Sequence, residues 1–301
     1  MGNFPSVLGF PVFLHEQVKE ISRVEIWHRV WIDGKDIGYW RACGLKMKPI
    51  RSAFYDDGTA KTWVSDVSEG SNLWPELKAY MGDEPHFVNT FFTDEERLSA
   101  EWCILRGVGG LKPTEPVGGI WSSEYYENRC PVCGSGWTPI APFCLAKEPQ
   151  MGRNAFSSFA SAAYQMFASG EVFEAFEAES IRGVDSWPVL VGKDRHSAAG
   201  LKQFLVKNVA EPALAEDLVE HERFRSSDCS ACGRTWHIFY SRGMLPLRRS
   251  ALRLDVDFQM TYEWFGSGRA ARREILVPRR VVEIILSKKW RGAELSPVHT
   301  V

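Results

Sequence analysis

Four of the seven cysteines of this 301-residue chain fall into two copies of one motif, Cys-x-x-Cys-Gly. Cys130 and Cys133 form the first copy, and Cys229 and Cys232 form the second. Zinc prefers thiolate ligands, and the glycine permits the tight turn that presents two sulfurs to one ion. Two such hairpins complete a tetrahedral shell with no position left for water or substrate. The four cysteines therefore predict one structural zinc ion rather than a catalytic one.

Two other interpretations of the paired cysteines stay open, a site that has lost its metal and a redox role. A thioredoxin-type pair would open a helix after a strand and would lack a second matched pair. A zinc deaminase would have a His-x-Glu motif and a proline before the first cysteine, but Arg129 precedes Cys130 and no His-x-Glu occurs. The roughly 95 residues between the motifs do not exclude a shared ion, because the free energy of loop closure grows slowly with length.

The other three cysteines, Cys43, Cys103 and Cys144, are isolated, and an odd total does not form a disulfide framework. Reduced thiols favour a cytoplasmic protein. Pro5 and Pro11 interrupt the apolar run at the N-terminus, so we expect no cleaved signal peptide. No stretch approaches the roughly 20 apolar residues that span a bilayer, so we expect no membrane partner.

The composition, 45% hydrophobic and 25% charged, is that of an ordinary globular protein. A net charge of −2 argues against a surface built throughout to grip nucleic acid. The segment from Leu245 onward nevertheless holds eleven Lys and Arg against six Asp and Glu, which leaves a local basic face or a solvated helix face open. The sequence has no His-Glu-x-x-His, Gly-x-Ser-x-Gly or Walker motif, so we expect no enzyme.

Several side chains near the motifs have two interpretations. His237 could support the zinc ligands, or could be a half-buried histidine beside Trp236. Trp121, Tyr125 and Tyr126 could form an exposed aromatic platform, or could pack against the first hairpin.

The elements that must position the motifs fall into two predicted regions. Residues 24–32 alternate as a strand does, residues 93–96 form a capping box that opens a short helix, and residues 102–105 are strand-like. The Gly- and Pro-rich stretch 107–119 is the best boundary. We therefore predict an α+β protein, with an N-terminal mixed domain at 1–112 and a pseudo-duplicated zinc-knuckle, helix and strand region at 113–301.

An internal repeat supports the second region. Residues 130–137 match 229–236 at an offset of 99, and residues 172–189 match 281–298 at an offset of 109. The second block of each half combines a helix, an Arg-Gly pair and a short strand that ends in Pro-Val, and the predicted halves are about 121–200 and 201–301. The alternative is a coincidence of a common helix, glycine and strand pattern.

Two residue types within the repeat predict local geometry. Gly183 and Gly292 stand where a helix would end in a left-handed turn. Pro188 and Pro297 suit an edge or terminal position in a strand, because proline cannot donate a ladder hydrogen bond.

The two motifs, together with the C-terminal segment 265–298, resemble the double-CXXCG-motif immunity proteins of bacterial toxin-exchange systems. The resemblance covers roughly residues 121–301. Members of that family are small cytoplasmic proteins that bind and neutralise a cognate toxin delivered between kin cells, with no known catalytic activity. The resemblance implies an immunity protein whose partner is a protein toxin. Only Cys130, Cys133, Cys229 and Cys232 carry over by position.

In that family the first motif lies much nearer the N-terminus, whereas 129 residues precede it here, which favours an added domain. The first rival function is a zinc-ribbon nucleic-acid-binding protein, suggested by the basic C-terminal segment. Its binding would weaken steeply as salt increases. The second rival is a toxin-modifying enzyme, which would turn its target over rather than form a one-to-one complex.

Overall fold

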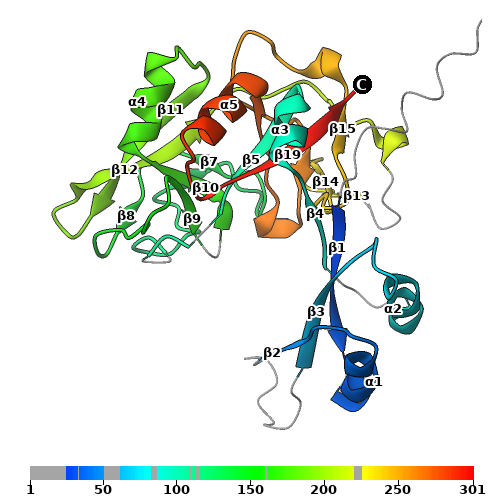
Figure 1. Cartoon of the computed structure of the whole chain (residues 1–301). Coiled ribbons are helices and arrows are strands. Elements are labelled where there is room, and N and C mark those ends of the chain that lie inside the picture. The colour runs from blue at the N-terminus through cyan, green and yellow to red at the C-terminus, as the bar shows by residue number, and fades with distance from the viewer. Residues whose placement is uncertain are drawn as a thin grey trace, which may run out of the picture.

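The computed structural model describes residues 25–32, 34–50, 62–82, 87–108, 110–112, 115–159, 162–219 and 226–301. Over these residues the protein is mixed α and β, mostly strands with five α-helices (Figure 1), which confirms the α+β class at that level. None of the helices in these ranges is long and apolar enough to cross a membrane. The N-terminal apolar run with Pro5 and Pro11 lies outside the described residues, so the expectation of no signal peptide stays a prediction.

The N-terminal strands form a four-stranded antiparallel sheet of order β2-β3-β1-β4, at the bottom of Figure 1. Its elements are β1 (Glu25–Ile32), α1 (Ile37–Ala42), β2 (Lys48–Ile50), β3 (Thr62–Ser68), α2 (Trp74–Met81) and β4 (Phe87–Phe91). Alternate residues of β1 are buried, and Val30 and Ile32 belong to the same buried cluster as Trp40 of α1 and Leu77 of α2. The strand predicted at 24–32 is thereby confirmed.

A predicted capping box opens the next helix, α3 (Asp94–Ser99). The Thr93 hydroxyl accepts a bond from the backbone N–H of Glu96, and the Glu96 carboxylate accepts one from the N–H of Thr93. The helix leads into β5 (Trp102–Gly107), the strand predicted at 102–105. Both predictions are confirmed.

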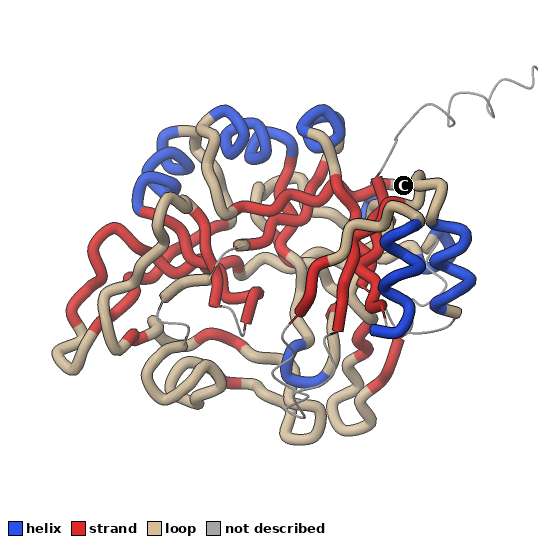
Figure 2. Tube along the Cα trace, turned by 60° about the horizontal axis from the view of Figure 1, so that its bottom comes forward, coloured by secondary structure: helices blue, strands red, loops and turns tan. Residues whose placement is uncertain are grey.

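Two five-stranded sheets form the largest part of the described molecule, and two short helices lie against them (Figures 1 and 2). Sheet 1 has the order β8-β11-β12-β10-β9, and sheet 2 has the order β15-β19-β5-β18-β16. The strands of sheet 1 are β8 (Cys144–Leu145), β9 (Phe156–Phe159), β10 (Ala162–Ser169), β11 (Val184–Val191) and β12 (His196–Val206). Those of sheet 2, besides β5, are β15 (Leu245–Leu247), β16 (Gln259–Met260), β18 (Ile275–Pro278) and β19 (Ala293–Thr300). Helix α4 (Gly170–Ala178) joins β10 to β11, and α5 (Arg279–Ser287) joins β18 to β19.

Sheets 1 and 2 share one pairing scheme, including the register. In both, one edge strand is parallel to its neighbour and the other pairs are antiparallel. One central residue in each sheet pairs with both flanking strands at matching positions: Gln203 with Phe167 and Trp187, and Ile104 with Leu276 and Ser296. The partners of the central residues, Phe167 and Leu276 or Trp187 and Ser296, differ by 109 in residue number, which is the offset of the second repeat block. The central residues, Ile104 and Gln203, differ by 99, which is the offset of the cysteine motifs. The two sheets therefore have the same backbone plan.

The central strands come from opposite ends of the repeated segment. We define unit A as residues 102–191 and unit B as residues 196–300. Each unit has the same order of elements. A first strand is followed by a cysteine hairpin, two edge strands, an inner strand, a helix and a last strand. The first strand of unit A, β5, lies in the middle of sheet 2, and the first strand of unit B, β12, lies in the middle of sheet 1. The two units thus exchange their first strands.

This exchange bears on the predicted domains. The boundary at residue 112 falls between β5 and the rest of unit A, and the halves meeting at residue 200 divide β12. The Gly- and Pro-rich stretch is not a linker where it is described, since the N–H of Val108 donates to the carbonyl of Gly292 and Gly110 forms a bridge with Ser158. The division into two domains stays a prediction, but β5 shares a sheet with the C-terminal residues.

The two Arg-Gly segments pack against each other's units. Gly183 has φ 91° and Gly292 has φ 85°, so both are left-handed as predicted, but neither ends its helix. Helix α4 ends at Ala178 and α5 at Ser287, and the left-handed residues that follow the two helices are Ser180 and Lys289. The backbone N–H groups of Asp257 and Phe258 donate to the carbonyl of Arg182. The N–H groups of Ala155 and Phe156 donate in the same way to the carbonyl of Arg291. These reciprocal bonds join the units at two equivalent places.

The edge-strand prediction for Pro188 and Pro297 is wrong, because β11 and β19 both lie inside their sheets. The reason lies in the local pairing of each strand. Strand β11 pairs with β12 on both sides of Pro188, but the register shifts between Pro188 and Leu190, and β8 also pairs with β11 from Leu190. Strand β19 pairs with β5 as far as Pro297 and with β15 from Val298. Pro188 therefore stands at an irregularity in its ladder and Pro297 at a change of partner, and both positions tolerate a residue that has no N–H.

One buried cluster lies between the units. It includes Val172 and Phe176 of α4, Val281 and Ile285 of α5, and the strand residues Phe156, Phe204 and Phe258. Because helices from both units share this cluster, it joins sheets 1 and 2. Each sheet also has a separate buried cluster, which includes Phe167 and Val189 in sheet 1 and Ile104 and Leu276 in sheet 2.

Polar contacts attach the N-terminal sheet to unit B. The guanidinium of Arg242 forms an ion pair with Glu69, which also contacts His28. The Thr90 hydroxyl of β4 donates to the carbonyl of Ser241 at 2.8 Å and accepts from the N–H of Gly243 at 2.8 Å. The edge of the N-terminal sheet is therefore bonded to the chain that follows the second cysteine hairpin.

Candidate metal centre

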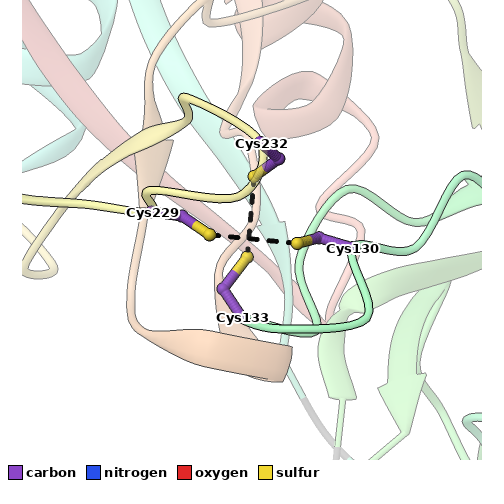
Figure 3. A group of neighbouring side chains, drawn as sticks. All are labelled: Cys130, Cys133, Cys229 and Cys232. Atoms are coloured by element: carbon purple, nitrogen blue, oxygen red, sulfur yellow. Dashed lines mark hydrogen bonds between the residues drawn. The ribbon is translucent and has the colours of Figure 1, made fainter.

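The four motif cysteines converge at one place (Figure 3). The Sγ atoms of Cys130 and Cys229 are 3.9 Å apart, those of Cys133 and Cys232 are 3.8 Å apart, and all four lie within 4.8 Å of one another. All four thiols are free, and these separations are far longer than the roughly 2.05 Å of a disulfide. The structure therefore brings together the four residues that the sequence predicts.

These separations fit a metal ion. A tetrahedron with metal–sulfur bonds of about 2.3 Å has sulfur–sulfur edges of about 3.8 Å. Both short separations match that edge. The donor set, four thiolates with no oxygen or nitrogen, is typical of closed structural sites. The four cysteines can thus hold one metal ion.

Backbone hydrogen bonds fold each hairpin. In the first, the N–H of Cys130 donates to the carbonyl of Ser135, and the N–H of Gly134 donates back to the carbonyl of Cys130. In the second, the N–H groups of Cys229 and Gly233 make the equivalent bonds. Gly134 has φ 75° and Gly233 has φ 67°, a conformation that side chains with a Cβ rarely adopt. The glycine of each motif is therefore required by its turn.

Short strands fix the ends of each hairpin. The first is held by β6 (Tyr126–Glu127) paired with β7 (Thr138–Pro139). The second belongs to a three-stranded sheet of β13 (Ser226–Asp228), β14 (Thr235–His237) and β17 (Trp264–Phe265). Each pair of thiols thus comes from a turn held at both ends.

The hairpins also stabilise thiolates. The N–H groups of Cys133 and Val132 point at Cys130 and lower its pKa to about 6. Burial acts to raise the pKa of Cys229, but the N–H groups of Ala231 and Cys232 outweigh burial, and the pKa of Cys229 is lowered. At Cys232 the N–H of Arg234 acts to lower the pKa, yet burial and the neighbouring thiols leave it raised. Two of the four cysteines are therefore prepared to lose their protons to a metal.

The two hairpins touch as well as face each other. A Cβ on Gly136 would lie 2.4 Å from the guanidinium carbon of Arg234, and one on Gly134 would lie 2.7 Å from the Cγ of Arg269. The Arg234 guanidinium also donates to the carbonyl of Ser135. Side chains of unit B therefore pack directly on the first hairpin. Sequence reasoning missed Gly136 and Arg234, and the only signal was the second glycine after Cys133.

The remaining residues considered near the motifs have structural roles. Tyr125 and Tyr126 are buried against Phe143, and Trp121 lies 5.1 Å from Trp137 between ring centroids, so the packing interpretation is confirmed. His237 is 4% exposed and contacts the Phe265 ring.

The three isolated cysteines lie outside the cluster of four. Cys103 is fully buried in β5, where burial raises the pKa of its thiol to about 12. A thiol with so high a pKa stays protonated and unreactive.

No protein-family model matches the chain, and no curated protein matches it.

Proposed function

We propose that Cys130, Cys133, Cys229 and Cys232 bind one Zn²⁺ ion with a structural role. The donor set and the sulfur separations support zinc, which takes four thiolates in a tetrahedral shell. An ion held by all four would have no open position, so it would connect units A and B rather than activate a substrate. Each unit supplies two ligands, so the ion would oppose separation of the two hairpins.

Metal analysis tests this proposal. Protein purified under reducing conditions without added metal should contain one zinc per chain by inductively coupled plasma mass spectrometry. Double substitution of Cys133 and Cys232 by Ser should abolish the zinc, whereas substitution of Cys43, outside the cluster, should leave it in place. Absence of zinc from the wild-type protein would contradict the proposal.

We further infer that units A and B arose by duplication and strand exchange. The shared pairing register, the equivalent Arg-Gly contacts and the equivalent cysteine hairpins support this inference. A duplicated unit needs a central strand in its sheet, and each unit takes that strand from the other. On this view residues 25–91 form an added segment that precedes the duplicated region.

We propose that the protein is a cytoplasmic immunity protein that binds and neutralises a cognate bacterial toxin through protein–protein contact, without catalysis. The observation that carries this proposal is the convergence, at one site, of the four cysteines on which the resemblance to double-CXXCG immunity proteins depends. A metal-linked pair of units is a rigid scaffold, and a rigid surface loses little conformational entropy when it binds a partner.

Co-expression tests the immunity function. The toxin to test would be the C-terminal domain of a large secreted protein with a variable C-terminal end, if a neighbouring gene encodes one. This protein should restore growth to cells that express that domain, and the two purified proteins should form a one-to-one complex by size-exclusion chromatography with light scattering. Failure of both would contradict the proposal. Rescue together with chemical change of the toxin would favour the modifying enzyme instead.

A further inference from the structure

A cluster of tryptophan and arginine side chains lies beside the second cysteine hairpin. Strands β14 and β17 are parallel neighbours, and Trp236 pairs in register with Trp264, so both rings lie on the same face of their sheet. The next pair, His237 and Phe265, is buried on the opposite face. Both tryptophans are half-buried, so part of this outer face is open to solvent.

Arginines cover the aromatic rings. The guanidinium carbon of Arg273 lies 4.9 Å from the ring centroid of Trp264, and that of Arg234 lies 5.6 Å from it. Arg273 also lies 5.9 Å from the ring of Tyr262, which is 49% exposed. We call Arg234, Tyr262, Trp264 and Arg273, together with Trp236, the Arg–Trp surface.

Neither arginine of this surface forms an ion pair with a carboxylate of the described residues, although most ion pairs within the described ranges use arginine. Arg273 donates to the carbonyl of Tyr262, at 3.2 Å, and Arg234 donates to that of Ser135, at 3.4 Å. The two guanidinium groups repel each other, and the buried Glu263 attracts Arg273 without forming an ion pair with it. An anion placed between the two guanidinium groups would therefore be stabilised.

The first hairpin has a similar but smaller feature. The exposed Arg129, immediately before Cys130, lies 4.9 Å from the ring centroid of Trp137. It also forms no ion pair within the part of the chain that the structure describes. Positive charge without a local partner therefore occurs beside both hairpins.

We propose that the Arg–Trp surface binds an acidic segment of a protein partner, with its carboxylates paired to Arg234 and Arg273. This inference rests on the proposed function and names the chemistry by which the toxin would be recognised. The planar fork of arginine matches a carboxylate with two parallel hydrogen bonds, and stacking on Trp264 holds the guanidinium groups in place beforehand. Tryptophan, tyrosine and arginine are also the residues that contribute most at protein interfaces.

Nucleic acid fits the same surface less well. Single-stranded nucleic acid needs open ring faces on which bases stack, but guanidinium groups already lie over the face of Trp264. Affinity for duplex DNA comes largely from many contacts between phosphates and basic side chains, and two arginines supply few of them. The net charge of −2 does not add a long-range attraction for phosphate.

Direct titration of the zinc-loaded full chain tests the surface without the toxin. The probe is poly-L-glutamate at physiological salt, with oligo(dT) as the nucleic-acid comparison and tryptophan fluorescence as the signal. The double variant Arg234→Gln/Arg273→Gln should weaken poly-L-glutamate binding about tenfold or more, because two charge-assisted hydrogen-bonding groups are lost. The matched control Arg153→Gln, an exposed arginine elsewhere in unit A, should leave it unchanged.

Two results would overturn the inference. One is poly-L-glutamate binding that is absent, or equal in wild type and the double variant. The other is stronger, arginine-dependent binding of oligo(dT), which would make the surface a nucleic-acid site. Zinc content and melting temperature verify that each variant is folded. Because Arg234 packs on the first hairpin, Arg273→Gln alone provides the second variant if the double variant loses zinc, with Arg273→Lys expected to recover part of the affinity.

The same variants, titrated against the toxin domain, separate this inference from the proposed function. If the wild-type chain binds the toxin and the double variant binds equally well, the function stands and the inference falls. If the wild type does not bind the toxin, the immunity function falls and the poly-L-glutamate result alone decides about the surface.

Discussion

Sheets 1 and 2 have the same backbone pairing but different buried chemistry at one matching position. In sheet 2, Arg106 of β5 donates two hydrogen bonds to the buried carboxylate of Glu274, at 3.0 and 3.1 Å. In sheet 1, Leu205 takes the position of Arg106, because Leu205 pairs with Asp185 as Arg106 pairs with Glu294. Gln165 takes the position of Glu274, because the two residues are related by the repeat offset of 109. Both Leu205 and Gln165 are buried. An ion pair and a neutral pair therefore occupy equivalent sites.

This difference shows that backbone pairing preserves the plan of the two units while side chains diverge. The central strands β5 and β12 share almost no residues, yet they pair with their neighbours at the same positions. The residues that remain alike include the cysteines and glycines that the geometry of the turns requires. The metal site is the one place where the two units contribute identical side chains to one centre.

Loss of a metal ligand is expected to lower the stability of the protein most. Loss of a ligand from unit A should have the same effect as loss of one from unit B. Cys130→Ser and Cys229→Ser should each abolish the ion and lower the free energy of unfolding by at least about 4 kcal/mol, the stabilisation from an ion at roughly 1,000 times its dissociation constant. Urea unfolding with and without chelator measures this. Unequal losses, or a variant that keeps its zinc, would show that the units do not share one ion equally.

Removal of the buried charge of Glu274 in sheet 2 should also lower the stability of the protein, by less than loss of the metal ion. Glu274→Gln leaves the half-buried Arg106 without its main counter-charge, although Glu294 still pairs with it, and should cost about 2 to 3 kcal/mol in urea unfolding. The double variant Arg106→Leu/Glu274→Gln copies the residues of sheet 1 and should recover most of that loss. If the double variant is as unstable as the single one, the two positions are not equivalent.

The ion pair of Arg106 and Glu274 also makes the stability of the protein depend on pH. Burial acts to raise the pKa of Glu274, but Arg106 and Arg272 outweigh it and hold the pKa below its ordinary value of 4.5. A carboxyl whose pKa is lower in the folded state stabilises the fold above its unfolded pKa, and this stabilisation is lost as the pH falls through the folded pKa. Acid titration of stability should therefore show a loss below about pH 4.5 that the double variant lacks.

The Arg-Gly turns should show a graded difference between the units. A Cβ on Gly292 would lie 1.9 Å from the carbonyl oxygen of Phe156, and one on Gly183 would lie 2.6 Å from that of Phe258. Both glycines have positive φ, so alanine adds backbone strain to the clash. Gly292→Ala should cost about 3 kcal/mol and Gly183→Ala about 2 kcal/mol by thermal unfolding. The reverse order would indicate that the first turn is the tighter one.

The smallest expected difference is between the two helices. Val172 of α4 and Val281 of α5 are both fully buried in the shared cluster. Each substitution by Ala should cost about 2 kcal/mol. Because both side chains lie in one core, the double variant should deviate from the sum of the two losses. Strict additivity would favour two separate cores.

Several local features of the fold, and the four cysteines of the candidate metal centre, could be predicted from the sequence. The cysteine motifs, the strand at 24–32, the capping box at Thr93 and the positive φ of Gly183 and Gly292 depend on short-range chemistry, which a single sequence displays. The helix ends themselves were not predicted, because the left-handed residues there, Ser180 and Lys289, are not glycines. The exchange of β5 and β12 was not predictable, because strand pairing depends on backbone hydrogen bonds that side-chain identity does not encode. For the same reason Pro188 and Pro297 suggested edge strands, although Pro188 stands at a register shift and Pro297 where its strand changes partner.

X-ray absorption at the zinc edge tests the central claim most directly, that cysteines from both units hold one ion. The account predicts four sulfur neighbours at about 2.3 Å and no nitrogen or oxygen in the same shell. A shell that contains nitrogen or oxygen, or a second metal nearby, would contradict a single centre built from all four cysteines.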